Sequence, residues 1–272
     1  MTTWTPPVSL WVNHVPWDGA KFVAFVPKKS PATGPQGCRE LVEVARGRVR
    51  GIDDLGAEIR LSRMCNRARN AGDPETLLPM FKALWASEQP RDNRFNPVEL
   101  APRSWAYVVR EEAGQRLVDV MSWDLLGGAG KRPITNVRQL GLPQWRRLAE
   151  RPENRCLIPL TEFCEWTPDT HQVGAGKPLK GEMWFQVADQ PQFAVAGFWQ
   201  RTASGSGFAM VTCDANELVA PIHPKAMITI LDRKDHARWL ECGYDEVVAL
   251  QRPYDASRMT VRGPVFPTRT TN

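Results

Sequence analysis

The sequence predicts an α+β fold with a largely antiparallel, barrel-like curved sheet at its core and helices at its periphery. Short strand-like runs bounded by Gly, Pro or Asp dominate the second half of the chain. Helical spacing of apolar residues is confined to a few short segments. Short turns join successive runs, and antiparallel neighbours need only such turns, whereas parallel neighbours need long crossovers.

The first clear element is a helix that begins near Asp73. This residue can cap a helix that has Pro74 at its first position, and apolar residues then recur at helical spacing as far as Trp85. We expect this helix to run to about Glu88. The remaining expected elements are strands over 105–110, 117–121, 155–159, 182–188, 193–199 and 208–212, a helix over 142–151, a last helix capped by Asp232, and a loop after Arg262.

Residues 1–63 show no sustained period, so we interpret them as an irregular N-terminal extension and 64–272 as the folded domain. No apolar run approaches the roughly 18 residues of a membrane-spanning helix, and the first 20 residues do not resemble a secretion signal. We expect a soluble, cytoplasmic monomer. The six cysteines have no regular spacing and are interpreted as reduced thiols.

Charge alone does not identify a partner. The chain has 35 Lys and Arg against 30 Asp and Glu, a net charge of +5, of which +3 belongs to residues 1–63. A nucleic-acid surface must therefore come from local clustering of basic residues. No Cys or His pair has the spacing of metal ligands, and no cofactor motif is present in the sequence.

Four segments carry clusters of reactive and polar residues, namely 64–67 (MCNR), 135–138 (TNVR), 163–166 (FCEW) and 220–224 (APIHP). Together they resemble the SOS-response-associated peptidase (SRAP) family, whose members shield abasic sites in single-stranded DNA by covalent attachment. The resemblance runs over about 64–262. It implies a cross-linking enzyme of the DNA damage response, associated with the nucleoid on damaged DNA, with lyase and (auto)peptidase activity as further activities.

The resemblance implies that Cys65 becomes the N-terminal residue. One residue then carries both an α-amine and a thiol, and both groups are partly deprotonated near neutral pH. The amine can add to the aldehyde of an opened abasic sugar to form an imine. The sulfur can then close a five-membered thiazolidine ring.

Three further residues match the reactive positions of the family. Asn136 would orient the terminal amine. Glu165 lies between aromatic residues, where a partly desolvated carboxylate suits proton transfer. His223 would shuttle a proton to the sugar ring oxygen, because imidazole exchanges protons near neutral pH. Without the other motifs, each would be interpreted as an ordinary structural residue.

Other matched residues would hold the DNA strand, which proteins grip by base stacking along a basic groove. The resemblance assigns a phosphate contact to Arg138. The residues near the family's other DNA-contacting positions are Arg67, Arg69, Arg94 and Trp123.

The sequence departs from the family in three places. Asn66 replaces the commonest Gly after the cysteine, and 124–128 (DLLGG) replaces a Gly-x-x-Pro stretch. The third departure is the extension, because an internal Cys65 has no free amine. Either translation starts at Met64, which we favour, or the extension is removed later by cleavage or self-processing.

Two other functions compete with the cross-linking hypothesis. One is a thiol hydrolase in which His223 activates Cys65 or Cys213, although no orienting third residue is evident. The other is a module that binds single-stranded DNA without forming a bond. A complex that survives denaturation would distinguish cross-linking from binding alone.

Overall fold

The computed structural model describes residues 66–87, 98–128, 132–174 and 176–266, together with two short strands before them. Those strands, β1 (Phe22–Ala24) and β2 (Val42–Val44), pair with each other in antiparallel fashion. The chain divides into two compact units, Met1–Leu61 and Ser62–Asn272. All other strand pairings of the described residues lie within the second unit, so its sheets are complete by themselves.

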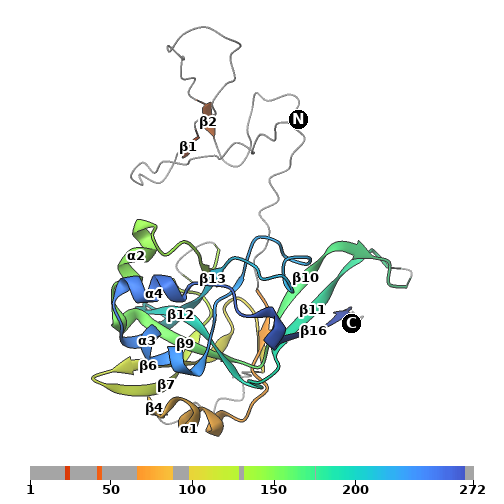
Figure 1. Cartoon of the computed structure of the whole chain (residues 1–272). Coiled ribbons are helices and arrows are strands. Elements are labelled where there is room, and N and C mark those ends of the chain that lie inside the picture. The colour runs from red at the N-terminus through yellow and green to blue at the C-terminus, as the bar shows by residue number, and fades with distance from the viewer. Residues whose placement is uncertain are drawn as a thin grey trace, which may run out of the picture. The chain divides into compact units, whose positions relative to one another are not determined.

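A closed five-stranded barrel forms the centre of the second unit (Figure 1). Its strands are β6 (Trp105–Glu112), β7 (Gln115–Ser122), β9 (Arg155–Leu160), β12 (Phe193–Thr202) and β13 (Gly205–Cys213). Antiparallel pairing runs from β13 through β12, β9 and β6 to β7, and a parallel contact between β7 and β13 closes the ring. The predicted α+β class with a largely antiparallel, barrel-like core is confirmed.

Closure of the barrel requires a glycine at residue 207, which lies opposite Ser122 where β13 meets β7. A Cβ atom on Gly207 would lie 2.1 Å from the carbonyl oxygen of Asp124. Non-bonded atoms cannot approach this closely, so any side chain here would force the two strands apart.

A second, five-stranded antiparallel sheet lies beside the barrel. Its order is β16 (Met259–Val265), β11 (Leu179–Val187), β10 (Glu162–His171), β3 (Ala68–Arg69) and β5 (Glu99–Leu100). Strands β10 and β11 form a long hairpin that extends away from the barrel (Figure 1). This sheet brings the residues just after Cys65 to the start of β10.

Four short strands extend the barrel sheet. They are β4 (Ala83–Trp85), β8 (Asn136–Val137), β14 (Met227–Ile228) and β15 (Ile230–Leu231). Strand β4 is parallel to β7, and β8 is parallel to β13, whereas β14 and β15 are antiparallel to β13 and β12. The pairing with β13 holds the 135–138 motif against the barrel.

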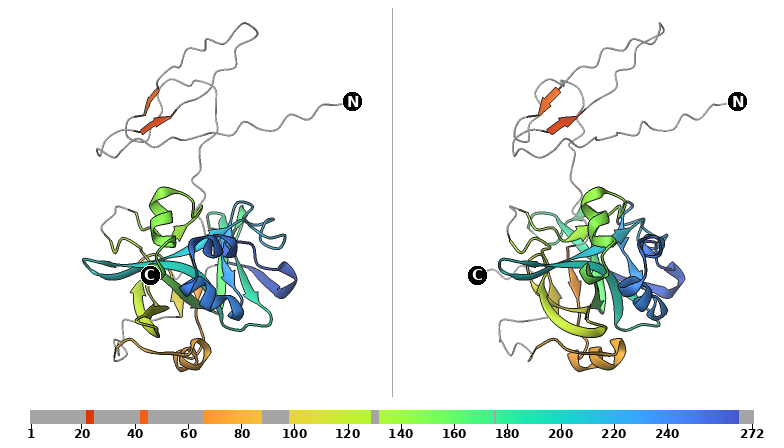
Figure 2. Two further views of the ribbon diagram at one scale, coloured as in Figure 1. Left: turned by 60° about the vertical axis from the view of Figure 1, so that its left-hand side comes forward. Right: turned by 90° about the vertical axis from the view of Figure 1, so that its left-hand side faces the viewer.

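Short helices cover one face of the barrel strands. They are α1 (Leu77–Phe81), α2 (Pro143–Ala149), α3 (His236–Glu241) and α4 (Tyr244–Leu250), with 3-10 turns at Pro74–Thr76, Pro152–Asn154, Arg233–Asp235 and Ala256–Arg258. Figure 2 shows α1 in orange, α2 in light green and α3 and α4 in blue around the strands.

Buried side chains of the barrel alternate between two clusters, as the two faces of a strand require. On β12, Val195 belongs to the cluster that the barrel shares with β10, β11 and β16, whereas Ala194 and Ala196 belong to the cluster that the barrel shares with the helices. The two clusters explain why the barrel strands have apolar residues on both faces.

The six predicted strands and the helix opened by Pro143 are confirmed, but the helix expected from Asp73 to about Glu88 is too long. It ends at Phe81, because Lys82 adopts a left-handed conformation with φ 51° and the chain continues as β4. Pairing with β7 leaves Leu84 59% exposed, so its apolar spacing did not mark a buried helical face.

Two other expectations near the C-terminus are corrected. The tail after Arg262 is not a loop at first, because β16 continues to Val265 beside β11. The helix after Asp232 is followed by a further helix, α4. Asp232 does not cap with its side chain, which instead accepts hydrogen bonds from Tyr254 and Arg258.

Candidate functional site

Asn136 lies on β8, where pairing with Met210 of β13 holds its backbone. Its Nδ2 donates to the hydroxyl of Thr135 at 3.0 Å and lies 3.5 Å from Oδ1 of Asn66. The Thr135 hydroxyl donates to the same Asn66 oxygen at 2.8 Å. The chain just after Cys65 is therefore hydrogen-bonded to the strand that carries Asn136, whereas Cys65 itself lies outside the described residues.

Glu165 lies on β10 and is only 1% exposed. Its neighbour Cys164 donates its backbone N–H to the carbonyl oxygen of Arg67 at 3.0 Å, and Ala68 pairs with Phe163. The segment after Cys65 thus runs beside β10 as well as beside Asn136. Two motifs more than 25 residues apart in the sequence meet on either side of residues 66 and 67.

His223 lies in the loop between β13 and β14, and its ring is fixed in one tautomer. Nδ1 lies 2.7 Å from the carbonyl oxygen of Ala226, which can only accept, so Nδ1 carries the proton. In the neutral imidazole, Nε2 is then an acceptor. This nitrogen is buried and has no hydrogen-bond partner among the described residues. Nε2 is therefore the ring nitrogen that can accept a hydrogen bond.

Arg138 connects β8 to the His223 loop. Its guanidinium donates to the carbonyl oxygen of Lys225 and to the carboxylate of Asp214. The Asp214 side chain is 82% exposed, so this ion pair faces solvent. Arg138 and His223 are consequently held by neighbouring residues of one loop.

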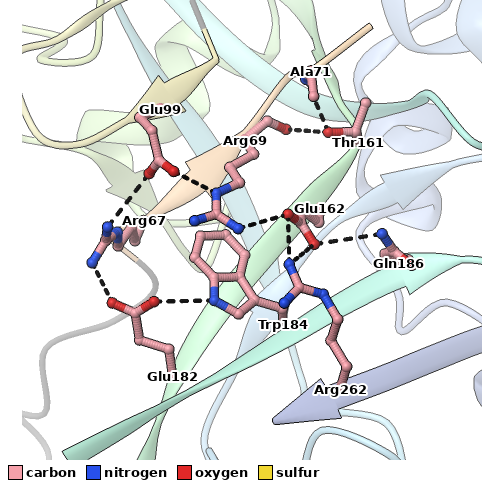
Figure 3. Close-up of polar contacts among 10 residues, drawn as sticks. All are labelled: Arg67, Arg69, Ala71, Glu99, Thr161, Glu162, Glu182, Trp184, Gln186 and Arg262. Atoms are coloured by element: carbon pink, nitrogen blue, oxygen red, sulfur yellow. Dashed lines mark hydrogen bonds and ion pairs between the residues drawn. The ribbon is translucent and has the colours of Figure 1, made fainter. Parts of the chain in front are cut away.

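Three arginines and three glutamates surround the indole of Trp184 (Figure 3). We call them the arginine–glutamate cluster, and its members are Arg67, Arg69, Arg262, Glu99, Glu162 and Glu182. The guanidinium carbon of Arg69 lies 3.9 Å from the centre of the Trp184 ring, and the indole N–H donates to Glu182 at 3.1 Å. The formal charges of the cluster cancel.

The glutamates of this cluster neutralise Arg67 and Arg69, the two arginines that we predicted to contact DNA phosphates. Arg67 is paired with Glu182 and Glu99, and Arg69 is paired with Glu99 and Glu162. A DNA phosphate would have to compete with these carboxylates. Contact of either arginine with DNA stays a prediction.

Trp123 is fully buried, which corrects the expectation that it stacks on a DNA base. Its ring lies parallel to Phe208 with centroids 6.3 Å apart, and its indole N–H donates to the carbonyl oxygen of Thr135 at 2.9 Å. A ring in this position has no exposed face for a base. Trp123 instead anchors the residue that precedes Asn136. Arg94 lies outside the described residues.

The unusual stretch over 124–128 organises the turn that leads to the site. The carboxylate of Asp124 is fully buried and accepts hydrogen bonds from the backbone N–H groups of Leu126, Gly128 and Ile134, at 3.2, 2.9 and 3.1 Å. These bonds hold the chain just before Thr135. The departure from the family pattern therefore has a structural role.

The buried thiols of Cys164 and Cys213 are poor nucleophiles. Burial raises the pKa of Cys213 to about 11 and that of Cys164 to about 12, so both thiols stay protonated at neutral pH. The Sγ atom of Cys213 faces the carbonyl oxygens of Met227 and Ile228. The version of the hydrolase hypothesis that uses Cys213 is not supported.

Sequence reasoning missed several residues of this region, namely Thr135, Glu99, Glu162, Glu182, Trp184 and Arg262. Thr135 stood inside a quoted motif, but nothing in the pattern marked its hydroxyl as a contact of Asn66. The predicted strand over 182–188 contains Glu182 and Trp184 on one face, which was the available signal for the cluster.

Among residues that the structure describes, no helix is long and apolar enough to cross a membrane. Within the same ranges, no three His, Cys, Asp or Glu side chains form a group that could hold a metal ion.

Comparison with protein families gives one match, described as SOS response associated peptidase (SRAP), over residues 64–265. The chain belongs to the SRAP family. Membership associates it with the SOS response to DNA damage, with the processing of abasic sites and with DNA as a partner. Comparison with curated protein sequences gives no significant match.

Solved structures share the fold of the SRAP domain. A protein from Bacteroides thetaiotaomicron is 20% identical, with a TM-score of 0.58 over 72% of this chain and 90% of that one. A protein from Bordetella bronchiseptica is 21% identical, with a TM-score of 0.57 over 72% and 98%. A phage-related protein from the same organism is 15% identical, with a TM-score of 0.55 over 76% and 95%.

Proposed function

We propose that this SRAP chain, when Cys65 is its N-terminal residue, forms a thiazolidine cross-link with abasic sites in single-stranded DNA and so shields them. One observation carries the proposal. Residues 66 and 67, which follow Cys65 directly, are hydrogen-bonded to Thr135 and Asn136 on one side and to the β10 strand of Glu165 on the other. The reactive amine and thiol would thus enter a site that already holds two matched residues.

The reaction balances without a cofactor. The amine nitrogen of Cys65 attacks the C1′ aldehyde of the opened sugar, and loss of water leaves a C=N imine. The Cys65 sulfur then attacks the imine carbon, which forms the C–S bond, and the nitrogen takes up a proton. The product is a ring that ties the protein to the DNA.

The matched side chains have separate roles in this scheme. Asn136, whose Nδ2 is directed to Thr135 and Asn66, would orient the terminal amine of Cys65 through its amide oxygen, which accepts hydrogen bonds. Glu165 offers a buried carboxylate for proton transfer during imine formation. His223 would exchange a proton with the sugar ring oxygen through Nε2.

DNA phosphates would contact Arg138, with Arg67, Arg69 and Arg94 as further contacts. Arg138 is the best placed of the described arginines, because its partner Asp214 is mostly exposed. Exposed ion pairs contribute little free energy, so a phosphate can replace Asp214 readily. The bond from Arg138 to Lys225 would remain and keep the His223 loop in place.

The test compares a chain that begins at Met64, from which the initiator Met is removed, with its Cys65→Ala variant. The first should form an adduct with abasic single-stranded DNA that survives denaturation, and the variant should form none. Intact mass should show the protein plus the DNA minus one water. Equal cross-linking by the Ala variant would rule out Cys65 as the attachment point.

A thiol hydrolase built on Cys65 and His223 is the second candidate, favoured by the acceptor Nε2 of His223 and by the family's description as a peptidase. It predicts hydrolysis of a peptide or ester that depends on Cys65 and needs no abasic DNA. The cross-linking proposal instead predicts an adduct that requires abasic DNA and requires no peptide or ester substrate.

A further inference from the structure

We infer that Asn66 is a positioning residue, which holds the amide of Asn136 in the orientation that the reaction needs. The inference rests on the proposed function and deepens it. Asn66 stands where the family most often has glycine, so this role belongs to the chain described here rather than to the common pattern.

The hydrogen bonds define the orientation of the Asn136 amide. Its Nδ2 lies 3.0 Å from the Thr135 hydroxyl and 3.5 Å from Oδ1 of Asn66. The Thr135 hydroxyl gives its own proton to Asn66 Oδ1 at 2.8 Å, so it can only accept from Asn136. If the Asn136 amide flipped, its oxygen would face two acceptors. The flipped state is therefore disfavoured.

The backbone of Thr135 is held in place by its own hydrogen bonds, and Asn66 then determines the direction of the Thr135 hydroxyl proton. Thr135 is 7% exposed, and its carbonyl oxygen accepts from Trp123 at 2.9 Å and from the backbone of Met210 at 2.9 Å. A lone threonine hydroxyl could donate in another direction and would then leave the Asn136 amide less strongly oriented. The oxygen of Asn66 sets the direction of the hydroxyl proton.

The chemistry of Asn66 predicts which substitutions matter. Asn66→Ala and Asn66→Gly remove the acceptor, whereas Asn66→Asp keeps an acceptor oxygen at the same distance from the backbone. Thr135→Val removes the hydroxyl that links the two amides, and Thr135→Ser keeps it. We expect the variants without the link to be slower and the conservative variants to recover most of the rate.

The experiment measures single-turnover adduct formation at saturating abasic single-stranded DNA, with chains that begin at Met64, whose sheets are complete without residues 1–61. Asn66→Ala and Thr135→Val should lower the rate about tenfold, while the Kd for intact single-stranded DNA and the Tm stay within error. Gln115→Ala, at the exposed first residue of β7, is the matched control.

A second readout does not depend on the reaction. In the full chain, the side-chain ¹H–¹⁵N signals of Asn136, assigned with Asn136→Asp, should shift in Asn66→Ala and stay near the parent values in Asn66→Asp. Unchanged Asn136 signals, or an Asn66→Ala variant that reacts at the parent rate, would overturn the inference. A parent chain that forms no adduct would overturn the proposed function, and the positioning role with it.

Discussion

Glu165 and His223 are the two residues that we propose to transfer protons, and the fold holds each of them in a different way. The carboxylate of Glu165 is 1% exposed on a strand that also carries core residues. The ring of His223 is held through Nδ1, which directs the lone pair of Nε2 away from the loop backbone. The backbone of Glu165 is held by pairing with Met183 of β11, and the ring of His223 is held by its bond to Ala226.

The first prediction concerns the proton transfers that we propose for Glu165 and His223. Glu165→Gln and His223→Ala should each slow adduct formation by about 10²-fold or more, because each removes one proton transfer. Binding to intact single-stranded DNA should stay nearly unchanged, since neither residue is proposed to contact phosphate. The measurements are the single-turnover rate and the Kd. Parallel loss of both would mean that the substitution had damaged the fold.

A second titratable residue, His236, affects stability rather than reaction. Burial lowers its pKa from 6.5 to about 4, with the charges of Arg116 and Arg233 adding to the effect and Asp235 opposing it. The unfolded chain therefore binds more protons than the folded chain between these values. The contribution of His236 to the free energy of unfolding should be fully present above about pH 6.5. It should fall by about 3 kcal/mol as the pH drops towards 4 and level off below that.

The measurement for His236 is the urea midpoint as a function of pH. His236→Gln, which cannot titrate, should show a shallower fall over the same window. If the parent and the variant lose stability in parallel from pH 7 to pH 4, the acid sensitivity belongs to other groups.

At the scale of elements, one buried arginine ties two helices to the barrel. Arg155 of β9 is fully buried and donates to the carbonyl oxygens of Ala149, Trp239 and Cys242, at 3.0, 3.1 and 2.6 Å. These carbonyls lie at the C-terminal ends of α2 and α3, where a positive charge is favoured. Burial lowers the pKa of Arg155, but an arginine stays charged at physiological pH.

Replacing Arg155 should therefore destabilise the domain strongly. Arg155→Met leaves three buried carbonyl groups without their donor, and we expect a loss of about 3 kcal/mol or more in the free energy of unfolding. The exposed residue Arg147 of α2 provides the control, since Arg147→Met should change it little. Urea denaturation measures both. A loss below about 1 kcal/mol would show that the helix ends find other partners.

The link between β8 and the His223 loop gives a prediction about DNA. If a phosphate replaces Asp214 at Arg138, Asp214→Asn should raise the affinity for single-stranded DNA, because a competing charge is removed. Arg138→Ala should lower the affinity and reduce the slope of log affinity against log salt by about 0.7. Fluorescence anisotropy over a salt series measures both, with Glu241→Gln on α3 as control. An unchanged slope would remove Arg138 from the phosphate contacts.

At the scale of the whole molecule, the segment before the SRAP domain should affect the reactivity of Cys65 and not the folding of the domain. The strands and cores of 66–266 are formed within the second unit, so the domain should fold whether or not residues 1–61 are attached. The two chains differ in the reactivity of Cys65. When residues precede it, its nitrogen is an amide, whose lone pair is delocalised and cannot form an imine.

The full chain with Met1 retained should consequently bind DNA but form no thiazolidine. The test offers abasic single-stranded DNA to this chain, shown by mass to be unprocessed, beside the chain that begins at Met64. Circular dichroism and thermal unfolding check that both are folded. A cross-link of equal yield from the unprocessed chain would require a different attachment chemistry.

The sequence by itself determined the fold class, the five barrel strands and the family, because these depend on local patterns. Alternation of apolar residues is visible within five or six residues, and each motif is a contiguous stretch. Even the placement of Asn136, Glu165 and His223 on segments of the folded domain followed from motif order alone.

Only the tertiary structure decided how charge and burial are distributed at the site, since those depend on residues far apart in the sequence. Arg67 meets Glu182 across 115 positions, and Thr135 meets Asn66 across 69. No local pattern distinguishes an arginine that faces a phosphate from one that is already paired with a carboxylate. Nor does any local pattern distinguish a tryptophan that stacks on a base from one that, like Trp123, is buried against Phe208. Packing sets both outcomes, because the free energy of a charge or an aromatic ring depends on the groups that surround it in space.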